Sequence, residues 1–326
     1  MMSDELDATD SENRSTFHSY LQLMRLPNVF TAMADVAMGF LFVQWGGTKW
    51  TPTPLDFATL ATLIAASSLL YLAGMVLNDV FDLDIDRQER PERPIPSGRV
   101  SLDTARRLGW RLLILGVAAG TSAMFFTGSL RSGVAAAILA TAVLLYDAWL
   151  KRTPLGPLAM GACRMLNVML GMSAVDVQMH AEHWLVAGAI GVYVAGITWF
   201  ARKESEQSSR LQLTAATLVI VLGIAMLASL PHWSNRLVRE LHDVIFGVQR
   251  WYLLVLLMGA WVLRRYVHAI ADPTPQRVRT AVSQGILSIV VFDAAACYAV
   301  RGVFCATMVL LFLLPAMFLK RWIETT

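Results

Sequence analysis

The feature that most constrains this chain is a series of apolar runs, each close to the roughly 20 residues that an α-helix needs to cross a bilayer. Hydrophobic residues make up 56% of the 326-residue sequence and charged residues 16%, whereas soluble proteins carry about 25% charged residues. Backbone groups in lipid must pair within their own segment, so such runs form helices. The runs cover residues 28–45, 57–77, 106–126, 131–150, 156–175, 184–200, 211–230, 250–268, 281–300 and 303–319. They predict an all-α polytopic membrane protein with about nine to ten transmembrane helices.

The two ends of the chain leave two further expectations. Residues 1–20 are polar and acidic, without the basic start and apolar core of a signal peptide, and are expected to form a disordered tail. Residues 21–326 then form one transmembrane domain. The last two runs are joined only by Arg301 and Gly302, so they can form either a tight hairpin or one long bent element.

The distribution of lysine and arginine predicts the orientation in the membrane. Most of the 27 Lys and Arg residues fall in loops on the same side as the N-terminus. Cytoplasmic loops of membrane proteins are enriched in these two residues. The N-terminus, the loop after the second run and the C-terminus are therefore expected to face the cytoplasm, in a multi-pass protein of the cell inner membrane.

The loop after the second run begins at Asn78 and reads "NDVFDLDIDRQERPERPIPSG". Asp79, Asp82 and Asp86 are spaced i, i+3, i+7, and Asn78, Asp82 and Asp86 are spaced i, i+4, i+8, so both sets share a helix face, while Asp84 should face elsewhere. Carboxylates this close repel one another unless a cation binds between them. Grouped oxygen ligands suit Mg²⁺, which takes one or two carboxylates and completes its shell with water and phosphates.

Arginines accompany these carboxylates and suggest a phosphorylated ligand. Arg87, Arg90, Arg93 and Arg99 follow the acidic positions, and a planar guanidinium is suited to binding phosphate through two hydrogen bonds. Together the two sets indicate a magnesium–diphosphate site at the membrane surface. The alternative is a solvated loop of surface salt bridges.

The residues of this loop resemble a motif of a known family of membrane proteins. The Asn-Asp-x-x-Asp-x-x-x-Asp pattern from Asn78, with Arg93-Pro94 and Ser97-Gly98 after it, resembles the first Asp-rich motif of the UbiA superfamily of intramembrane prenyltransferases. "RLPN", which ends at Asn28, resembles the family's entry to the first helix. "YDAWLKRTPLG", which begins at Tyr146, resembles the end of its fourth helix.

The resemblance implies a ring of helices around a central cavity and a Mg²⁺-dependent prenyltransferase. An isoprenyl diphosphate would bind with Mg²⁺ and ionise to an allylic cation, which an aromatic or other electron-rich acceptor attacks. The implied partners are the diphosphate, that hydrophobic or aromatic acceptor and the lipid bilayer, with no nucleic acid. By position the metal would be held by Asn78, Asp79, Asp82 and Asp86. Diphosphate or substrate contacts would come from Arg25, Asn28, Arg93 and Lys151, and Tyr146 would orient the substrate or shield the cation.

The sequence departs from the family at a second Asp-rich motif, expected after the sixth helix. That stretch reads "TWFARKESEQSSRLQL" and contains no Asp. Either Glu204 replaces the second metal site, or one metal suffices and Arg202, Lys203 and Arg210 compensate the phosphate charge. The replaced loop and "CRMLNVMLG" resemble the EboC-type UbiA-like proteins of bacterial metabolite clusters, which implies an alternative function in binding, handling or exporting a metabolite precursor without prenyl transfer.

Polar side chains inside the runs are also candidates. Arg164 and Asn167 lie one turn apart in the fifth run, and an arginine in lipid is costly, so it should face the cavity. It could bind a substrate phosphate or pair with a neighbouring helix. Asp35 and Asp293 are buried in the same way, and a contact between helices is the favoured interpretation for both.

Overall fold

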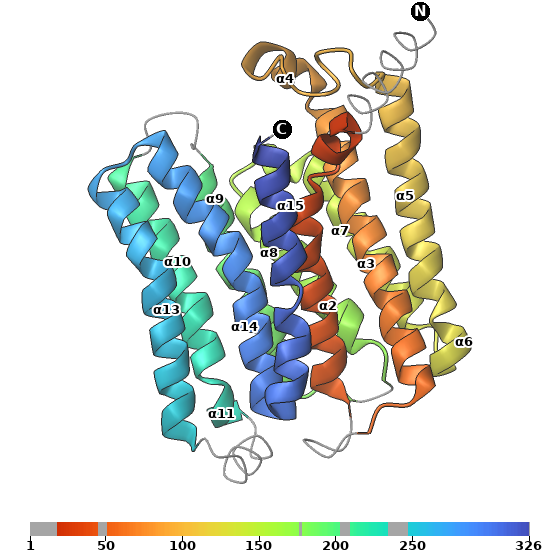
Figure 1. Cartoon of the computed structure of the whole chain (residues 1–326), viewed down its shortest axis with the longest axis vertical. Helices are drawn as coiled ribbons and strands as arrows, with labels where there is room; N and C mark the ends of the chain where they lie inside the picture. The colour runs from red at the N-terminus through yellow and green to blue at the C-terminus, as the bar shows by residue number, and fades with distance from the viewer. Residues whose placement is uncertain (1–17, 45–50, 176–177, 203–208, 234–246, 326) are drawn as a thin grey trace, which may run out of the picture.

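The computed structural model describes residues 18–44, 51–175, 178–202, 209–233 and 247–325. Within these ranges the chain is helical and contains no strand, which confirms the all-α expectation. The acidic tail expected at the N-terminus lies almost wholly outside the described residues. Figure 1 shows long helices standing side by side, with α4 and the C-terminal end of α15 at one end of the bundle and α6 and α11 at the other.

The elements follow one another with short connections, and Figure 1 labels most of them. Their bounds are η1 Leu26–Asn28, α2 Val29–Val43, α3 Pro54–Phe81, α4 Leu83–Glu89, α5 Leu102–Ser122, α6 Met124–Thr127, α7 Arg131–Ala148, η3 Leu150–Arg152, α8 Gly156–Met172, α9 Ala181–Ala201, α10 Arg210–Ala228, α11 Leu230–Trp233, α13 Val248–Ala271, α14 Pro275–Leu310 and α15 Leu313–Thr325.

Eight segments of the described chain are long and apolar enough to cross a membrane. Two features explain why eight such segments are found where the sequence predicts nine to ten transmembrane helices. Helix α8 has 17 residues, which is at the lower limit of the length that crosses a bilayer, and it is not among the eight. The segment Pro275–Leu319 has 45 residues and contains both of the last two expected spans.

The break in that segment is at Gly302, whose φ of 75° and ψ of −169° are not helical. An L-residue with a side chain rarely adopts a positive φ, so glycine suits this position. Figure 1 shows α14 descending from the end that holds α4 and the chain then turning back, so that α15 rises to the same end. Of the two arrangements that the sequence left open, the hairpin is therefore the one that forms.

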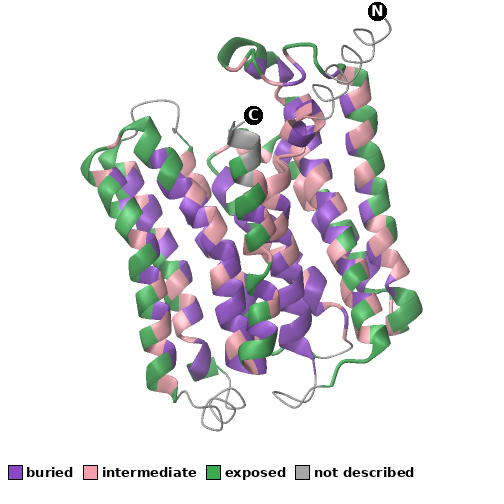
Figure 2. Ribbon diagram, viewed as in Figure 1, coloured by how far each residue is buried: buried purple, intermediate pink, exposed green. Residues whose placement is uncertain are grey.

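Burial divides the helices into an inner and an outer set (Figure 2). In the segment Leu26–Val43, which η1 and α2 form, 72% of the residues are buried. The most apolar stretches of Leu102–Thr127 and of α13 have only 28% of their residues buried. The outer helices expose large apolar side chains such as Ile114 and Leu256. A surface of this kind is typical of helices that face lipid.

Small residues bring α2 and α8 into close contact. A Cβ atom added to Gly39 would overlap the carbonyl oxygen of Val168, and one added to Gly171 would overlap the carbonyl oxygen of Val36. Glycine at such positions lets the backbones of membrane helices approach closely. This contact sets polar residues of α8 beside polar residues of α2 in the centre of the bundle.

Candidate functional site

The acidic segment lies at the end of the bundle that holds α4. Helix α3 ends at Phe81, and Asp82 joins it to α4 with a φ of −95° and a ψ of 5°. The amide of Asp82 still donates to the carbonyl of Asn78 at 3.0 Å, and that of Asp86 donates to the carbonyl of Asp82 at 2.8 Å, as in a continuous helix. The acidic face therefore continues across the joint. A cavity of about 520 Å³, called here the mouth, lies between this segment and the end of α7. Residues that line it include Arg25, Asn78, Asp82, Asp86, Glu89, Arg90, Arg93, Tyr146, Lys151, Arg152, Thr198, Ala201 and Arg202.

Two oxygen-bearing residues of the mouth accept hydrogen bonds from the cationic side chains that follow α7. The Nζ atom of Lys151 donates to the Oδ1 atom of Asn78 at 2.8 Å and to Asp82 at 2.7 Å. Arg152 donates to the other oxygen of Asp82 at 3.2 Å. Lys151 and Asp82 expose only 11% and 18% of their side chains, so this ion pair is poorly screened by water.

A second pair of carboxylates is held by Arg93, from the loop after α4. Arg93 donates to Asp86 at 2.6 Å and to Asp79 at 3.3 Å, and Arg25 donates to the same oxygen of Asp79 at 3.1 Å. Asp79 lines a neighbouring cavity of about 410 Å³ together with Arg25 and Arg93. Thus Asn78, Asp82 and Asp86 line the mouth, whereas Asp79 lines the neighbouring cavity and binds the two arginines from that side.

The outer face of α4 behaves as its spacing predicts. The side chain of Asp84 is 94% exposed and its ion-pair partner is Arg87, at 3.3 Å. Asp84 therefore points away from the mouth, as expected. Arg99 also lies outside it and donates to the backbone carbonyl of Glu92 at 2.6 Å.

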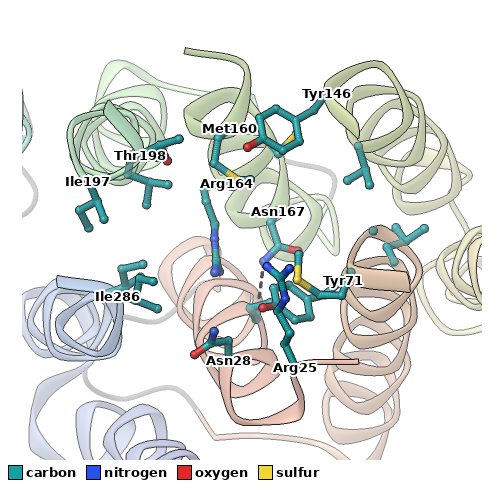
Figure 3. A pocket seen from close by; sticks show the side chains of 18 of the residues that line it. Arg25, Asn28, Tyr71, Tyr146, Met160, Arg164, Asn167, Ile197, Thr198 and Ile286 are labelled. Atoms are coloured by element: carbon teal, nitrogen blue, oxygen red, sulfur yellow. Dashed lines mark hydrogen bonds between the residues drawn. The ribbon is translucent and has the colours of Figure 1, made fainter. Parts of the chain in front are cut away.

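A second cavity, called here the chamber, has a volume of about 330 Å³ and a mainly apolar lining (Figure 3). This volume is within the range of small-molecule sites, about 300–1,000 Å³. Arg25, Tyr146, Thr198 and Ala201 line both the chamber and the mouth. A ligand with a charged head and an apolar tail could therefore occupy both cavities at once.

One wall of the chamber carries the polar residues of α8. Arg164 donates to Asp35 at 2.8 Å and to the hydroxyl of Thr31 at 2.8 Å. Asn167 donates to Asp35 at 3.1 Å and accepts from the hydroxyl of Ser67 at 2.7 Å. Both residues line the chamber, and Figure 3 shows them on the same side of it.

The partners of Arg164 account for its position inside the membrane, because a buried guanidinium needs a paired carboxylate. Asp293 of α14 is fully buried and lies beside Asp35. Arg164 and Asp35 connect α8 and α2, which is the contact between helices expected for Asp35. Among the described residues, neither carboxylate oxygen of Asp293 has a hydrogen-bond partner.

The replaced loop after α9 is only partly described. Arg202 lines the mouth, and its guanidinium donates to the carbonyl of Thr153 at 2.7 Å. Arg210 donates to the carbonyl of Ala271 at 3.1 Å, away from the mouth. Lys203 and Glu204 lie outside the described residues.

Sequence reasoning missed three residues near the candidate site. Arg152 holds Asp82 although only its neighbour Lys151 was singled out, and both follow the same helix end. Thr198 gave no sequence signal, because a threonine in an apolar run is common. Asp147, beside Tyr146, was overlooked although a carboxylate inside an apolar run is unusual.

The donor set of the mouth fits Mg²⁺. Among the described residues no group of three or more His, Cys, Asp or Glu side chains is assembled as a metal cage. Mg²⁺ does not require such a cage, because it binds through one or two carboxylates together with water and substrate phosphates. Asn78, Asp82 and Asp86 provide hard oxygen donors on one wall of the mouth.

The fold and the two cavities define a class: a helical membrane protein with a charged site at the membrane surface that opens into an apolar chamber. The UbiA prenyltransferase family matches residues 36–289 of the sequence. The chain therefore belongs to the UbiA prenyltransferase family, which confirms the resemblance seen in its Asp-rich motif.

Individual relatives match parts of the chain. The digeranylgeranylglyceryl phosphate synthase of Saccharolobus solfataricus is 31% identical over 169 residues, which are 52% of this chain and 54% of that protein. The enzyme of the same name from Sulfolobus acidocaldarius is 37% identical over 99 residues, 30% of this chain and 33% of that protein. The chain thus matches about a third to a half of the length of these relatives.

Solved structures share the fold over most of the chain. A UbiA homologue from Archaeoglobus fulgidus bound to GPP and Mg²⁺ has a TM-score of 0.58 at 14% identity, covering 86% of this chain and 99% of that one. A digeranylgeranylglyceryl phosphate synthase structure has a TM-score of 0.57 at 20% identity, covering 92% and 98%. At these identities the likeness concerns the fold.

Proposed function

We propose that this protein is a Mg²⁺-dependent prenyltransferase that moves an isoprenyl group from its diphosphate to an aromatic or other electron-rich acceptor. The observation that carries the proposal is the junction of the two cavities. The mouth combines oxygen donors with cations, and it shares Arg25 and Tyr146 with the apolar chamber. An isoprenyl diphosphate has the matching shape, with a charged head and an apolar tail.

The residues of the mouth suit the departure of diphosphate, which develops negative charge. When bound at Asn78, Asp82 and Asp86, Mg²⁺ would neutralise much of that charge. Lys151 and Arg93, which now hold the same oxygens, are in reach of a phosphate group in the mouth. Fixed cations in a site with little water stabilise such charge more strongly than in bulk solvent.

The remaining substrate-binding residues belong to the chamber. Tyr146 and Asn28 line it beside Arg25, so they would orient the first isoprene unit where the carbon–oxygen bond breaks. Arg164 and Asn167 would contact the apolar tail of the donor, or the acceptor, from the wall of the chamber that α8 forms. The relatives named digeranylgeranylglyceryl phosphate synthase support transfer of an isoprenoid and leave this chain's own acceptor open.

A second candidate is an EboC-type protein that binds a phosphorylated metabolite precursor without transferring a prenyl group. The absence of Asp from the sequence between Thr198 and Leu213 favours it, because the first Asp motif then has no second Asp motif to match it. Arg202 and Lys203 in that stretch would bind phosphate rather than a second metal, with Glu204 orienting one of them.

Metal-dependent binding tests the site that both candidates share. Asp82→Ala should abolish Mg²⁺-dependent binding of geranyl or farnesyl diphosphate, measured by isothermal titration calorimetry in detergent. Asp84→Ala is the matched control, because Asp84 lies on the same segment but points to solvent. If Asp82→Ala binds the diphosphate as the wild type does, the assignment of the mouth is wrong.

Product analysis separates the two candidates. The wild type is incubated with geranyl, farnesyl or geranylgeranyl diphosphate and a panel of phenolic acceptors. Prenylated product that disappears in Asp82→Ala would exclude the non-catalytic candidate. Diphosphate binding without product across the panel would favour it, and neither binding nor product would contradict both.

A further inference from the structure

Asp147 is a buried carboxylate that the proposed site does not yet use. It is near the end of α7, lines the chamber and is only 2% exposed. Within the described part of the chain its buried Oδ2 atom has no hydrogen-bond partner. An unpaired carboxylate inside a membrane protein is costly and usually marks a function.

A purely structural role for Asp147 lacks the contacts that it would need. Lys151 is one helical turn further along and is the natural partner for an ion pair, but it donates instead to Asn78 and Asp82. The neighbour of Asp147 across the helix interface is Gly74, where an added Cβ atom would lie 3.7 Å from the Oδ2 atom. The carboxylate therefore faces the chamber and a glycine rather than a donor.

Four other polar side chains on the walls of the chamber already have partners. Arg164 and Asn167 bind Asp35. The hydroxyl of Ser67 donates to Asn167, and that of Thr198 donates to the backbone carbonyl of Val194 at 2.9 Å. Among the described residues that line the chamber, Asp147 is thus the carboxylate left to accept a hydrogen bond from a ligand.

We propose that Asp147 accepts a hydrogen bond from a hydroxyl group of the acceptor and takes its proton during transfer. This inference rests on the proposed prenyl transfer. The bond between the first isoprenyl carbon and the diphosphate oxygen breaks, and the diphosphate leaves with the electron pair. The acceptor oxygen forms the new bond to that carbon, and its proton moves to the Asp147 carboxylate, which later releases it through the mouth.

The position of Asp147 supports this assignment. It is adjacent in sequence to Tyr146, which lines both the chamber and the mouth, so it lies close to the point where the charged head and the apolar tail of the donor would meet. A carboxylate can only accept hydrogen bonds, so a ligand group opposite it must be a donor. A hydroxyl acceptor, such as a phenol or an alcohol, meets that requirement.

Transfer kinetics provide the first test. Asp147→Asn keeps the size of the side chain and removes its basicity, and Asp84→Asn is the matched control. With labelled farnesyl diphosphate and a phenol from the panel, Asp147→Asn should bind the diphosphate within about twofold of the wild type. Its transfer rate should fall by roughly 10²-fold or more, the usual contribution of a general base. Unchanged transfer would refute the role, and so would a loss of diphosphate binding equal to the loss of transfer.

A binding test decides the inference even if the wild type forms no product. Each phenol of the panel is compared with its methyl ether, which lacks the hydroxyl donor, in titrations of protein with Mg²⁺ and inorganic pyrophosphate. The wild type should prefer the phenol by roughly tenfold, since a hydrogen bond to a charged group is stronger than one between neutral groups. Asp147→Leu should lose that preference. Equal affinity for phenol and ether in the wild type would overturn the inference, whereas a lasting preference without any transfer would count against the proposed function alone.

Discussion

At the scale of single residues, charge compensation explains the polar groups of this protein. Two cations at the mouth each hold two acidic or amide residues: Lys151 binds Asn78 and Asp82, and Arg93 binds Asp79 and Asp86. The oxygen donors that the sequence places on one helix face are thus kept from repelling one another before any ligand binds. The same cations would meet the phosphates of a substrate.

The pair of Arg164 and Asp35 gives a prediction at this scale. Asp35→Leu leaves the guanidinium without its carboxylate inside the bundle, and breaking a buried pair costs about 3–5 kcal/mol. The variant should unfold at a markedly lower temperature in detergent, measured by the fluorescence of a thiol-reactive dye on the buried cysteines.

The double variant Asp35→Leu/Arg164→Met provides the control, because it removes both charges and keeps an apolar volume. It should recover much of the lost stability. If the double variant is as unstable as Asp35→Leu, the loss comes from packing and the pair is not its cause.

At the scale of elements, the contact between α2 and α8 positions the chamber. Gly39 and Gly171 let the two backbones touch, and this approach sets Arg164 and Asn167 opposite Asp35. A larger separation would leave these polar groups without partners in an apolar environment. Close packing and polar pairing therefore depend on each other here.

Adding a methyl group to this contact should destabilise the protein. Gly171→Ala would place its Cβ atom against the backbone of Val36, which cannot move aside as a side chain can. Overpacking of this kind costs about 1–3 kcal/mol. Gly188→Ala is the matched control, because its Cβ atom would meet only the Cε atom of Met226 at 3.6 Å. Thermal unfolding that is equal in the two variants would contradict the close contact.

At the scale of the whole molecule, the two ends of the bundle differ in charge. The mouth and its arginines lie at the end that holds α4 and the C-terminal end of α15, while α6 and α11 lie at the opposite end (Figure 1). The excess of Lys and Arg at the α4 end predicts that this end faces the cytoplasm. A diphosphate made in the cytoplasm would then reach the mouth without crossing the membrane.

Cysteine labelling checks this orientation. In a variant whose three buried native cysteines are replaced, a cysteine at Ser97 should be protected from an impermeant maleimide added outside intact cells, and a cysteine at His232 should react. Both sites should react after the membrane is permeabilised, which shows that each is accessible. Labelling of Ser97 and His232 from the same side would refute the arrangement.

The sequence by itself determined the class of fold and the place of the mouth. Apolar runs of bilayer length can only be helices, and the spacing of Asn78, Asp82 and Asp86 fixes a shared face because helical periodicity is local. The same local rule placed Asp84 on the outer side, where the structure has it. The Asp-rich motif also carried the resemblance to the UbiA superfamily, which the family match confirms.

Only the tertiary structure decided which distant residues meet. The sequence could not separate Asp79, which holds Arg25 and Arg93 from behind, from the residues that line the mouth. It also could not show that Lys151 donates its hydrogen bonds to Asn78 and Asp82 and not to Asp147. The partner of Lys151 depends on how α7 packs against α3. The face of a helix on which a residue lies is set by its neighbours along the chain. The partner that its side chain contacts is set by packing between helices, which brings together residues far apart in sequence.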